Sequence, residues 1–237
     1  MHPFIEQAHP QWQNMLDNAM DQMDQSYIQE LLDSDDWLPG KDSLFAAFSL
    51  PLTDTRYILM GESPYPREKS ANGYAFWDNA VGSLWSKKGL SKEVNRATSL
   101  RNWIKMLLYA RGDLTDDFSQ DAIAKLDKSR YVQTADELFE SFLKTGFLLL
   151  NATLAYSKGK VNYHARKWRP FIHDLLNQLA ESKPSLKLIL LGRIAQKLPE
   201  SELFPSLEAE HPYNVSFITN KKVVSFFKPL DLLSRDD

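Results

Sequence analysis

Three short segments carry side chains suited to recognising and cleaving a polar ligand. They are Gly61-Glu62-Ser63-Pro64-Tyr65-Pro66, which runs on to Gly73-Tyr74-Ala75-Phe76, then Leu148-Leu149-Leu150-Asn151, and His211-Pro212-Tyr213-Asn214-Val215-Ser216. A carboxylate can position water, an amide can donate and accept hydrogen bonds at once, and an imidazole can donate to an oxygen that gains negative charge. Gly61 lets the backbone approach a ligand closely, and the two prolines stiffen the first loop. The segments therefore predict a ligand site.

Each segment follows a predicted strand. Short apolar runs occupy residues 57–60, 147–150, 186–191 and 207–209, and glycine or a polar residue ends most of them. Apolar, non-alternating strands separated by helices are typical of a parallel sheet covered on both faces, and ligands in such sheets bind where the strands' carboxyl ends lead into loops. The sequence therefore predicts an α/β fold, a three-layer α/β/α sandwich with a short, mainly parallel central sheet.

Helices are predicted from apolar residues at steps of three and four. The expected ranges are 12–32, 44–48, 99–110, 134–146, 168–179 and 223–233. Ser99 is expected to cap the third of these helices, and Thr134 with Glu137 to form a capping box. Pro170 is expected in the first turn of its helix, where a missing N–H costs little, and Pro229 to interrupt the last helix.

The composition favours one soluble domain. At 237 residues and 43% hydrophobic, the chain can bury a full core, and we expect a single domain over 1–237 with an acidic helical segment, 1–50, packed on it. No apolar run approaches the roughly 20 residues that span a bilayer. Without a secretory signal or any cysteine, the sequence predicts a cytoplasmic protein with no disulfide, cysteine-ligated zinc or iron–sulfur cluster. No other metal or cofactor is expected from the resemblance described below.

The net charge of −3 is unevenly distributed. Residues 1–60 hold two basic and ten acidic residues, 2 − 10 = −8, so the remainder carries −3 + 8 = +5. A polyanion such as nucleic acid is repelled by the first part and tolerated by the rest.

From Trp37 onward, the order and spacing of the three segments resemble the uracil-DNA glycosylases. The family's Gly-Gln-Asp-Pro-Tyr-His motif, with Gly-x-Ala-Phe after it, is matched by 61–66 and 73–76. Its Leu-Leu-Leu-Asn strand end is matched by 148–151, and its His-Pro-Ser-Pro-Leu-Ser loop by 211–216. Ser99-Leu100 and Gly192-Arg193 are smaller matches. The resemblance implies that a deoxyuridine is rotated out of DNA into this site.

The resemblance also implies roles for individual residues. Phe76 would stack on the base, Tyr65 would exclude the methyl group of thymine, and Asn151 would read the O4 and N3–H edge. His211 would donate to uracil O2 as charge develops on the leaving base. Other readings stay open, because Phe76 also suits a core, Tyr65 a loop anchor and Asn151 a strand end. The DNA contacts would be Ser99, Arg193, Val215 and Ser216, with Val215 in place of a leucine wedge.

The first segment departs from the family pattern. Ser63 stands where the family has the aspartate that orients the attacking water, and a neutral hydroxyl supplies no negative charge. Pro66 replaces a histidine, as in the poxviral branch. Glu62 directly follows Gly61, as in the Gly-Glu-x-Pro-Gly motif of the iron–sulfur uracil-DNA glycosylases. We therefore count Glu62 and Ser63 with His211 as candidate catalytic residues, with Glu62 either positioning water or capping loop N–H groups.

The function expected from the sequence is hydrolysis of the N-glycosidic bond of uracil, or of a related deaminated base, in DNA. The expected partner is DNA that contains such a lesion. The alternative is a degenerate member that binds DNA or a protein without catalysis, which the loss of the aspartate at Ser63 supports. A third reading is binding or hydrolysis of a free nucleoside or nucleotide on the same scaffold.

Overall fold

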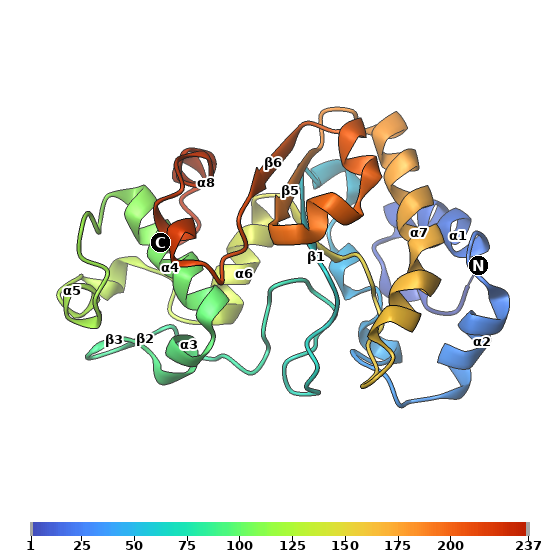
Figure 1. Ribbon diagram of the computed structural model, residues 1–237, viewed down its shortest axis with the longest axis horizontal. Coiled ribbons are helices and arrows are strands. Elements are labelled where there is room, and N and C mark those ends of the chain that lie inside the picture. Colours follow the sequence, from blue (N-terminus) through green and yellow to red (C-terminus); the bar gives the residue numbers. More distant parts are fainter. Residues whose placement is uncertain (1, 236–237) are drawn as a thin grey trace. The chain divides into compact units, whose positions relative to one another are not determined.

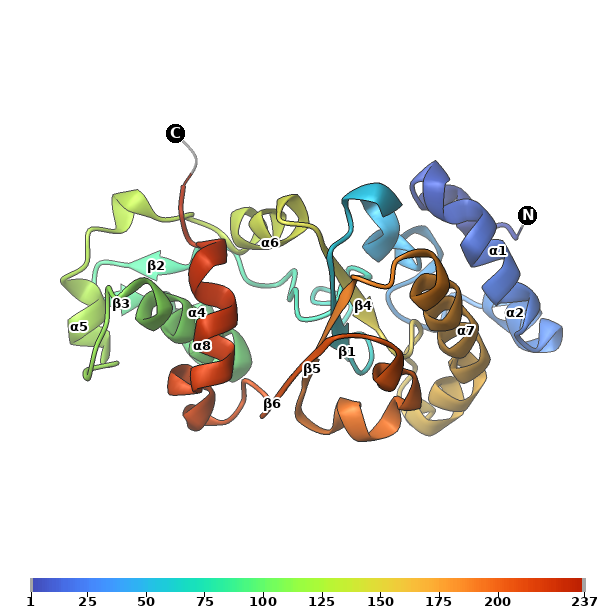
Figure 2. The same cartoon turned by 90° about the horizontal axis from the view of Figure 1, so that it is seen from above.

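The computed structural model describes residues 2–235, apart from the side chains at 195 and 196. Two compact units make up the chain (Figures 1 and 2). Unit 1 comprises the residues up to 78, 146–190 and 194–206, and unit 2 comprises 79–145, 191–193 and the residues from 207 onward. The single domain expected for 1–237 stays a prediction.

The central sheet has four strands in the order β4-β1-β5-β6 (Figure 2). β1 (Tyr57–Gly61) runs parallel to β4 (Phe147–Asn151) on one side and to β5 (Lys187–Leu191) on the other, and β6 is Ser206–Ala209. These strands lie where the apolar runs predicted them. The predicted α/β class with a short parallel sheet is confirmed, and the register places the last residue of β1 opposite the last residue of β4.

In unit 1, three helices and one face of the sheet share a core. The helices are α1 (Gln13–Asp21), α2 (Gln25–Asp33) and α7 (Val161–Ser182), and α7 packs against α1 (Figures 1 and 2). Ile58 and Met60 belong to this core, whereas Leu59 points to the other face and is equally buried. Because both faces are covered, the strands read as unbroken apolar runs in the sequence.

Three helix predictions in unit 1 are wrong. The helix expected over 12–32 is two helices, because the Asp24 carboxylate accepts from the Ser26 N–H at 3.0 Å and starts a new one. Pro170 lies inside α7, which already begins at Val161. Trp168 is fully buried in that earlier part, and this packing outweighs the hydrogen bond that Pro170 cannot make. The helix expected over 44–48 is a 3₁₀ turn.

Unit 2 is mainly helical and has an aromatic core. Its helices are α3 (Lys92–Arg96), α4 (Thr98–Arg111), α5 (Gln120–Ala124), α6 (Ala135–Lys144) and α8 (Lys221–Phe227), with a small hairpin of β2 (Trp85–Ser86) and β3 (Gly89–Leu90). The Trp103 ring lies 5.5–5.8 Å from those of Phe142, Phe217 and Phe227. None of the helices within residues 2–235 combines the length and apolar character needed to cross a bilayer.

The predicted ends of the unit 2 helices can be compared residue by residue. α4 begins at Thr98 and has Ala97 at its cap position, so the cap predicted at Ser99 is wrong. The Thr134 hydroxyl accepts from the Glu137 N–H at 3.1 Å, which is one half of the predicted capping box. The Glu137 carboxylate accepts from the N–H of Gln133, one residue before the expected partner, so the other half is not formed. α8 ends before Pro229, as expected, and a 3₁₀ turn follows. The 3₁₀ turns of the chain are Ile5–Gln7, Pro10–Trp12, Lys41–Ser43, Ala46–Ser49, Leu52–Asp54, Lys128–Arg130, Gly192–Lys197, Pro199–Leu203, Val215–Thr219 and Lys228–Leu230.

Candidate active site

The carboxyl ends of β1 and β4 bring Gly61 and Asn151 side by side in unit 1. The two residues are paired in the sheet register. A Cβ atom on Gly61 would overlap the Oδ1 atom of Asn151 and would lie 2.8 Å from the Cβ atom of Ala75. Only glycine therefore leaves room for the Asn151 side chain to lie across the end of β1.

The amide of Asn151 is buried without a hydrogen-bond partner. The residue is only 4% exposed, and within the described part of the chain no hydrogen bond reaches its side chain. Its Oδ1 and Nδ2 atoms are nevertheless not among the fully enclosed polar atoms that lack a partner, so the amide faces open space at the end of the strand. Asn151 therefore keeps both a donor and an acceptor free for a ligand.

The loop after β1 is tied to itself and to β4. The Tyr65 hydroxyl donates to the Phe76 carbonyl at 3.2 Å, and Arg67 pairs with the buried carboxylate of Asp78 at 3.0 Å. The Ala75 N–H donates to the Leu149 carbonyl at 3.0 Å. Burial, together with the nearby Asp78, raises the pKa of Tyr65 to about 12, so its hydroxyl stays protonated and remains a donor at neutral pH.

Phe76 has an unusual backbone conformation for a phenylalanine. Its φ angle is +64°, and its side chain is half-buried. A positive φ is strained for a residue with a Cβ atom and persists only where the surrounding structure enforces it. The bonds at Tyr65 and Ala75 do so here, and they hold the aromatic ring of Phe76 at the surface of the loop.

Glu62 and Ser63 line a different hollow of unit 1. The carboxylate of Glu62 pairs with Lys197, whose Nζ atom lies 2.7 Å from Oε1, and both side chains are more than half exposed at 61% and 63%. Glu62 and Ser63 border a cavity of about 180 Å³ that Thr153 and Arg169 also line. Tyr65, Phe76 and Asn151 do not line it.

In unit 2, the backbone determines where the proton of His211 lies. The Tyr213 N–H donates to Nδ1 of His211 at 3.1 Å. Because Nδ1 accepts this bond, the ring proton of the neutral imidazole is on Nε2, which is then a donor. Gly192, at a φ of +80°, lies against the ring, and a Cβ atom there would be 3.0 Å from the Cβ atom of His211. The site therefore presents a neutral imidazole as a hydrogen-bond donor.

The predicted site residues are divided between the units. Unit 1 contains Glu62, Ser63, Tyr65, Phe76 and Asn151, and unit 2 contains Ser99, Arg193, His211, Val215 and Ser216. Arg193, Val215 and Ser216 are exposed, and Ser99 is half-buried in the first turn of α4. The roles assigned to these residues from the sequence stay predictions.

Sequence reasoning missed two residues that support the site. Asn102, buried in α4, donates through Nδ2 to the Pro212 carbonyl at 2.8 Å and to the Tyr213 carbonyl at 3.2 Å. Lys197 pairs with Glu62, as described above. Each acts across more than 100 residues of sequence, and a single sequence carries no signal for such a pairing.

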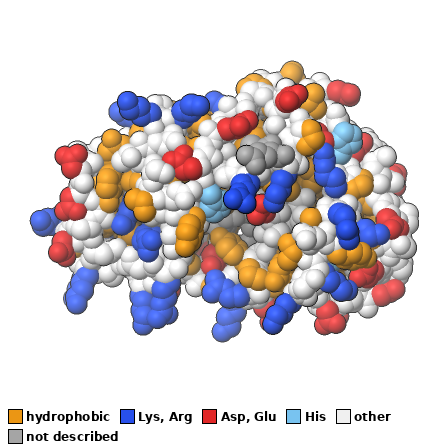
Figure 3. Space-filling view, viewed as in Figure 1, with side chains coloured by type: hydrophobic (Ala, Val, Ile, Leu, Met, Phe, Trp, Pro, Cys, Tyr) orange, Lys and Arg blue, Asp and Glu red, His pale blue; other side chains and the backbone are white. Residues whose placement is uncertain are grey.

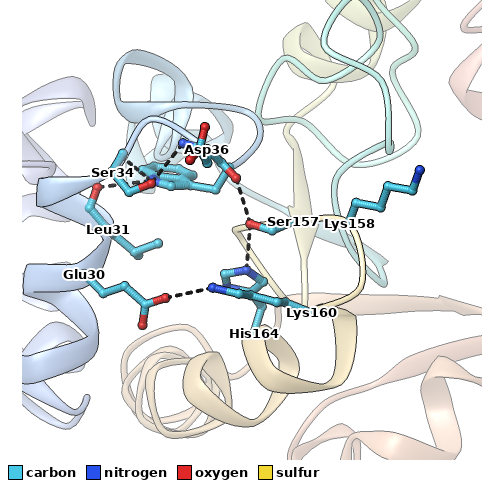
Figure 4. Close-up of a pocket in the computed structure, with 9 residues that line it drawn as sticks. Glu30, Leu31, Ser34, Asp36, Ser157, Lys158, Lys160 and His164 are labelled. Carbon is cyan, nitrogen blue, oxygen red and sulfur yellow. Dashed lines mark hydrogen bonds and ion pairs between the residues drawn. The ribbon is translucent and has the colours of Figure 1, made fainter.

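A second cavity of unit 1, of about 350 Å³, lies beside α2 and the start of α7 (Figure 4). Tyr27 bonds to Nδ1 of His164 at 2.6 Å, and Nε2 of His164 bonds to the Ser157 hydroxyl at 3.1 Å. That hydroxyl donates to the Asp36 carbonyl at 3.0 Å. Burial raises the pKa of Tyr27 and lowers that of His164, so a phenol donates to a neutral imidazole. Tyr27, His164 and Ser157 each have a hydrogen-bond partner within this chain of bonds, so we interpret it as a structural network.

Across the part of the chain that the structure describes, no three His, Asp or Glu residues come together in a way that could hold a metal ion, and the sequence has no cysteine.

Comparison with known proteins identifies the family. No family model matches the chain. The crystal structure of wild-type UNG from Nitratifractor salsuginis aligns with a TM-score of 0.92 at 44% identity, over 98% of this chain and 95% of that one. Mimivirus uracil-DNA glycosylase aligns with a TM-score of 0.60 at 18% identity, over 88% and 71% of the two chains, and shows the fold alone.

Curated sequences agree with the structural comparison. A uracil-DNA glycosylase of Nocardioides sp. is 27% identical over 213 residues, which are 87% of this chain and 80% of the relative. One of Lactococcus lactis subsp. lactis is 29% identical over 183 residues, which are 75% of this chain and 70% of the relative. The N. salsuginis structure is similar over nearly the full length of both chains. This chain belongs to the uracil-DNA glycosylase family.

Proposed function

We propose that this protein removes uracil from DNA by hydrolysing its N-glycosidic bond. The observation that carries the proposal is the buried, unpartnered amide of Asn151, which Gly61 admits at the end of β1. An amide donates to uracil O4 and accepts from N3–H, and the same orientation opposes the donor and acceptor pattern of cytosine. Membership of the uracil-DNA glycosylase family supports the same substrate.

The proposed roles of Tyr65 and Phe76 follow from how the loop holds them. The Tyr65 hydroxyl bonds to the backbone of Phe76, so the positions of the two rings depend on each other. Phe76 stacks on the base, and the Tyr65 ring takes the space beside C5. A thymine methyl group would meet that ring, whereas the hydrogen of uracil does not.

Bond cleavage transfers charge to the base. The C1′–N1 bond breaks, its electron pair leaves with uracil, and water adds to C1′ while losing a proton to solvent. The Nε2–H of His211 donates to O2, where the negative charge of the leaving base gathers. A neutral donor suits this step, because it stabilises the anion and keeps its own proton.

Glu62 is the proposed water-positioning group. It is the acid of the loop, and Ser63 beside it is neutral and supplies no charge to the cation that forms on the sugar. The Glu62 carboxylate pairs with Lys197, and both side chains are more than half exposed, so water reaches the carboxylate. A positioned carboxylate contributes about 10²- to 10⁴-fold to a hydrolytic rate.

The test is abasic-site formation on single-stranded oligonucleotides that contain uracil, thymine or cytosine at one position. The unaltered protein, Asn151→Leu and Glu62→Gln are compared at enzyme excess. We expect cleavage at uracil by the unaltered protein, and large losses in both variants. Cleavage by Glu62→Gln at the full rate would remove Glu62 from the mechanism and leave the activity in place.

A further variant addresses the missing aspartate. If the unaltered protein cleaves nothing and Ser63→Asp cleaves uracil, the pocket reads the base but lacks the chemistry, and the protein is a binding module. If neither cleaves and neither binds uracil-containing DNA more tightly than thymine-containing DNA, the proposal fails.

A further inference from the structure

Two large apolar side chains of unit 2 are exposed, and both lie on the loop that contains His211. Tyr213 is 67% exposed and Val215 is 73% exposed. The other large hydrophobic side chains exposed within the described residues are Val161 and Leu203, which belong to unit 1. Paired exposed apolar groups beside a proposed catalytic residue indicate a surface that meets a ligand.

The backbone around Tyr213 is held firmly. Its N–H donates to Nδ1 of His211, and its carbonyl accepts from Nδ2 of Asn102, which also holds the Pro212 carbonyl. The Asn214 N–H donates to the His211 carbonyl at 2.9 Å. Asn102 is buried in α4, so the loop is attached to the helical core of unit 2.

The side chain of Tyr213 takes no part in these contacts. Its ring stacks on no other ring and its hydroxyl makes no hydrogen bond, as far as residues 2–235 are concerned. A ring on a fixed backbone loses little conformational freedom when it stacks on a planar group. The structure thus presents an aromatic surface that the fold itself does not use.

The charges of unit 2 near this loop suit a polyanion. Lys221 and Lys222 are exposed in the first turn of α8, and no carboxylate of the described chain pairs with either or with Arg193. The space-filling view shows Lys and Arg side chains over α8 (Figure 3). Of the two acids that precede the loop, Glu208 is exposed, and Glu210 accepts from Nδ2 of Asn220 at 2.6 Å. A polyanion that offers planar rings is nucleic acid.

We propose that Tyr213 stacks on a DNA base that flanks the deoxyuridine. The inference rests on the proposed function, since His211 would bond the extruded uracil while Tyr213, two residues further on, meets the strand beside it. Val215 is too short to fill a vacated position in the base stack, and the ring of Tyr213 supplies the larger contact area. Tyr213 is thus a binding residue for the strand, and His211 remains the catalytic one.

The test removes the aromatic ring of Tyr213 from the protein and, separately, the bases that flank the deoxyuridine from the DNA. Binding is measured by fluorescence anisotropy with single-stranded oligonucleotides of about 15 nucleotides, a length matched to one binding site. They carry 2′-fluoro-deoxyuridine, whose fluorine opposes cleavage, flanked either by natural bases or by abasic spacers. The proteins are the unaltered chain, Tyr213→Ser, Tyr213→Phe, and Leu203→Ser as a matched exposed control.

With natural flanking bases, we expect Tyr213→Ser to raise Kd by about 5- to 100-fold, the range of one base–aromatic stack. Tyr213→Phe keeps the ring and should bind like the unaltered protein, as should Leu203→Ser. With abasic spacers, the unaltered protein and Tyr213→Ser should bind equally. An equal loss on both oligonucleotides, or none on either, would overturn the inference.

The two proposals fail in different ways. If the protein neither cleaves uracil nor prefers it to thymine, the proposed function is wrong, and the coupling between Tyr213 and the flanking bases still decides this inference. Because the Tyr213 side chain is mostly exposed and makes no hydrogen bond or ring contact with the described residues, Tyr213→Ser should leave the melting temperature nearly unchanged, which separates lost binding from lost folding.

Discussion

The Nζ atom of Lys197 lies 2.7 Å from Oε1 of Glu62, so the acid of the first loop is held by a cation from the 3₁₀ turn after β5. Both side chains are largely exposed, and an exposed ion pair contributes about 1 kcal/mol or less to stability. The pair therefore matters more for where the carboxylate points than for the fold.

This pairing predicts non-additive kinetics. Glu62→Gln should lower the cleavage rate by about 10²-fold or more, and Lys197→Met by less, because the carboxylate remains. If Lys197 acts only through Glu62, the double variant should be no slower than Glu62→Gln alone. Single-turnover rates on uracil-containing DNA measure this, and multiplied losses in the double variant would give Lys197 a separate role.

Replacing Asn151 should affect uracil cleavage far more than the stability of the fold. Leucine has the same branched shape without polar atoms, and no described hydrogen bond holds the amide, so Asn151→Leu should change the free energy of unfolding by no more than about 1 kcal/mol. It should also lower uracil cleavage by at least about 10³-fold, because the base loses its partner. Denaturant unfolding and cleavage rates check the two effects, and a destabilised variant would mean that the amide is satisfied in the fold.

Gly61 should tolerate no side chain. Gly61→Ala places a methyl group on the Asn151 amide and on Ala75, so it should cost about 1–3 kcal/mol of stability and displace the amide. The matched control is Gly82→Ala, where no atom lies within 4 Å of the added carbon. That variant should be neutral or up to about 1 kcal/mol more stable. Thermal unfolding and cleavage rates of both variants check this.

His164 should make the stability of unit 1 depend on pH. Burial lowers its pKa, with Lys160 acting in the same direction and Glu30 opposing them. Because the unfolded chain then binds the proton more readily, the stabilisation is present above about pH 6.5 and is lost as the pH falls below it. The loss between about pH 7.5 and about pH 5 should be smaller in His164→Gln. An equal loss in both proteins would contradict the assignment.

The strands were predictable because each is a short apolar run that ends at a glycine, an asparagine or a polar loop. β1 and β4 end at Gly61 and Asn151, where the sequence placed them. The bounds of the helices were harder to predict from the sequence. Asp24 breaks the first one through a bond to its own neighbour, and Pro170 is tolerated inside α7 because tertiary packing on both sides of it holds the helix.

The candidate site was predictable in its residue types and not in its pairings. The carboxylate, the amide and the imidazole can be found from motifs. The bond from Lys197 to Glu62 and those from Asn102 to the His211 loop join residues separated by 135 and about 110 positions, and only folding brings them together. The φ of +64° at Phe76 likewise depends on bonds from Tyr65 and Leu149 that no local pattern indicates.

The Asn151 amide at the end of β4, which has no described hydrogen bond, also indicates how selection has acted on the protein. In a lineage that no longer recognised a base, an apolar residue could replace Asn151 without the loss of any described hydrogen bond, so random drift would remove the amide. Its presence beside a glycine that leaves it room is what continued selection for a ligand would maintain. A decayed relative that had lost its substrate should show the opposite pattern, with the amide gone and Gly61 free to change.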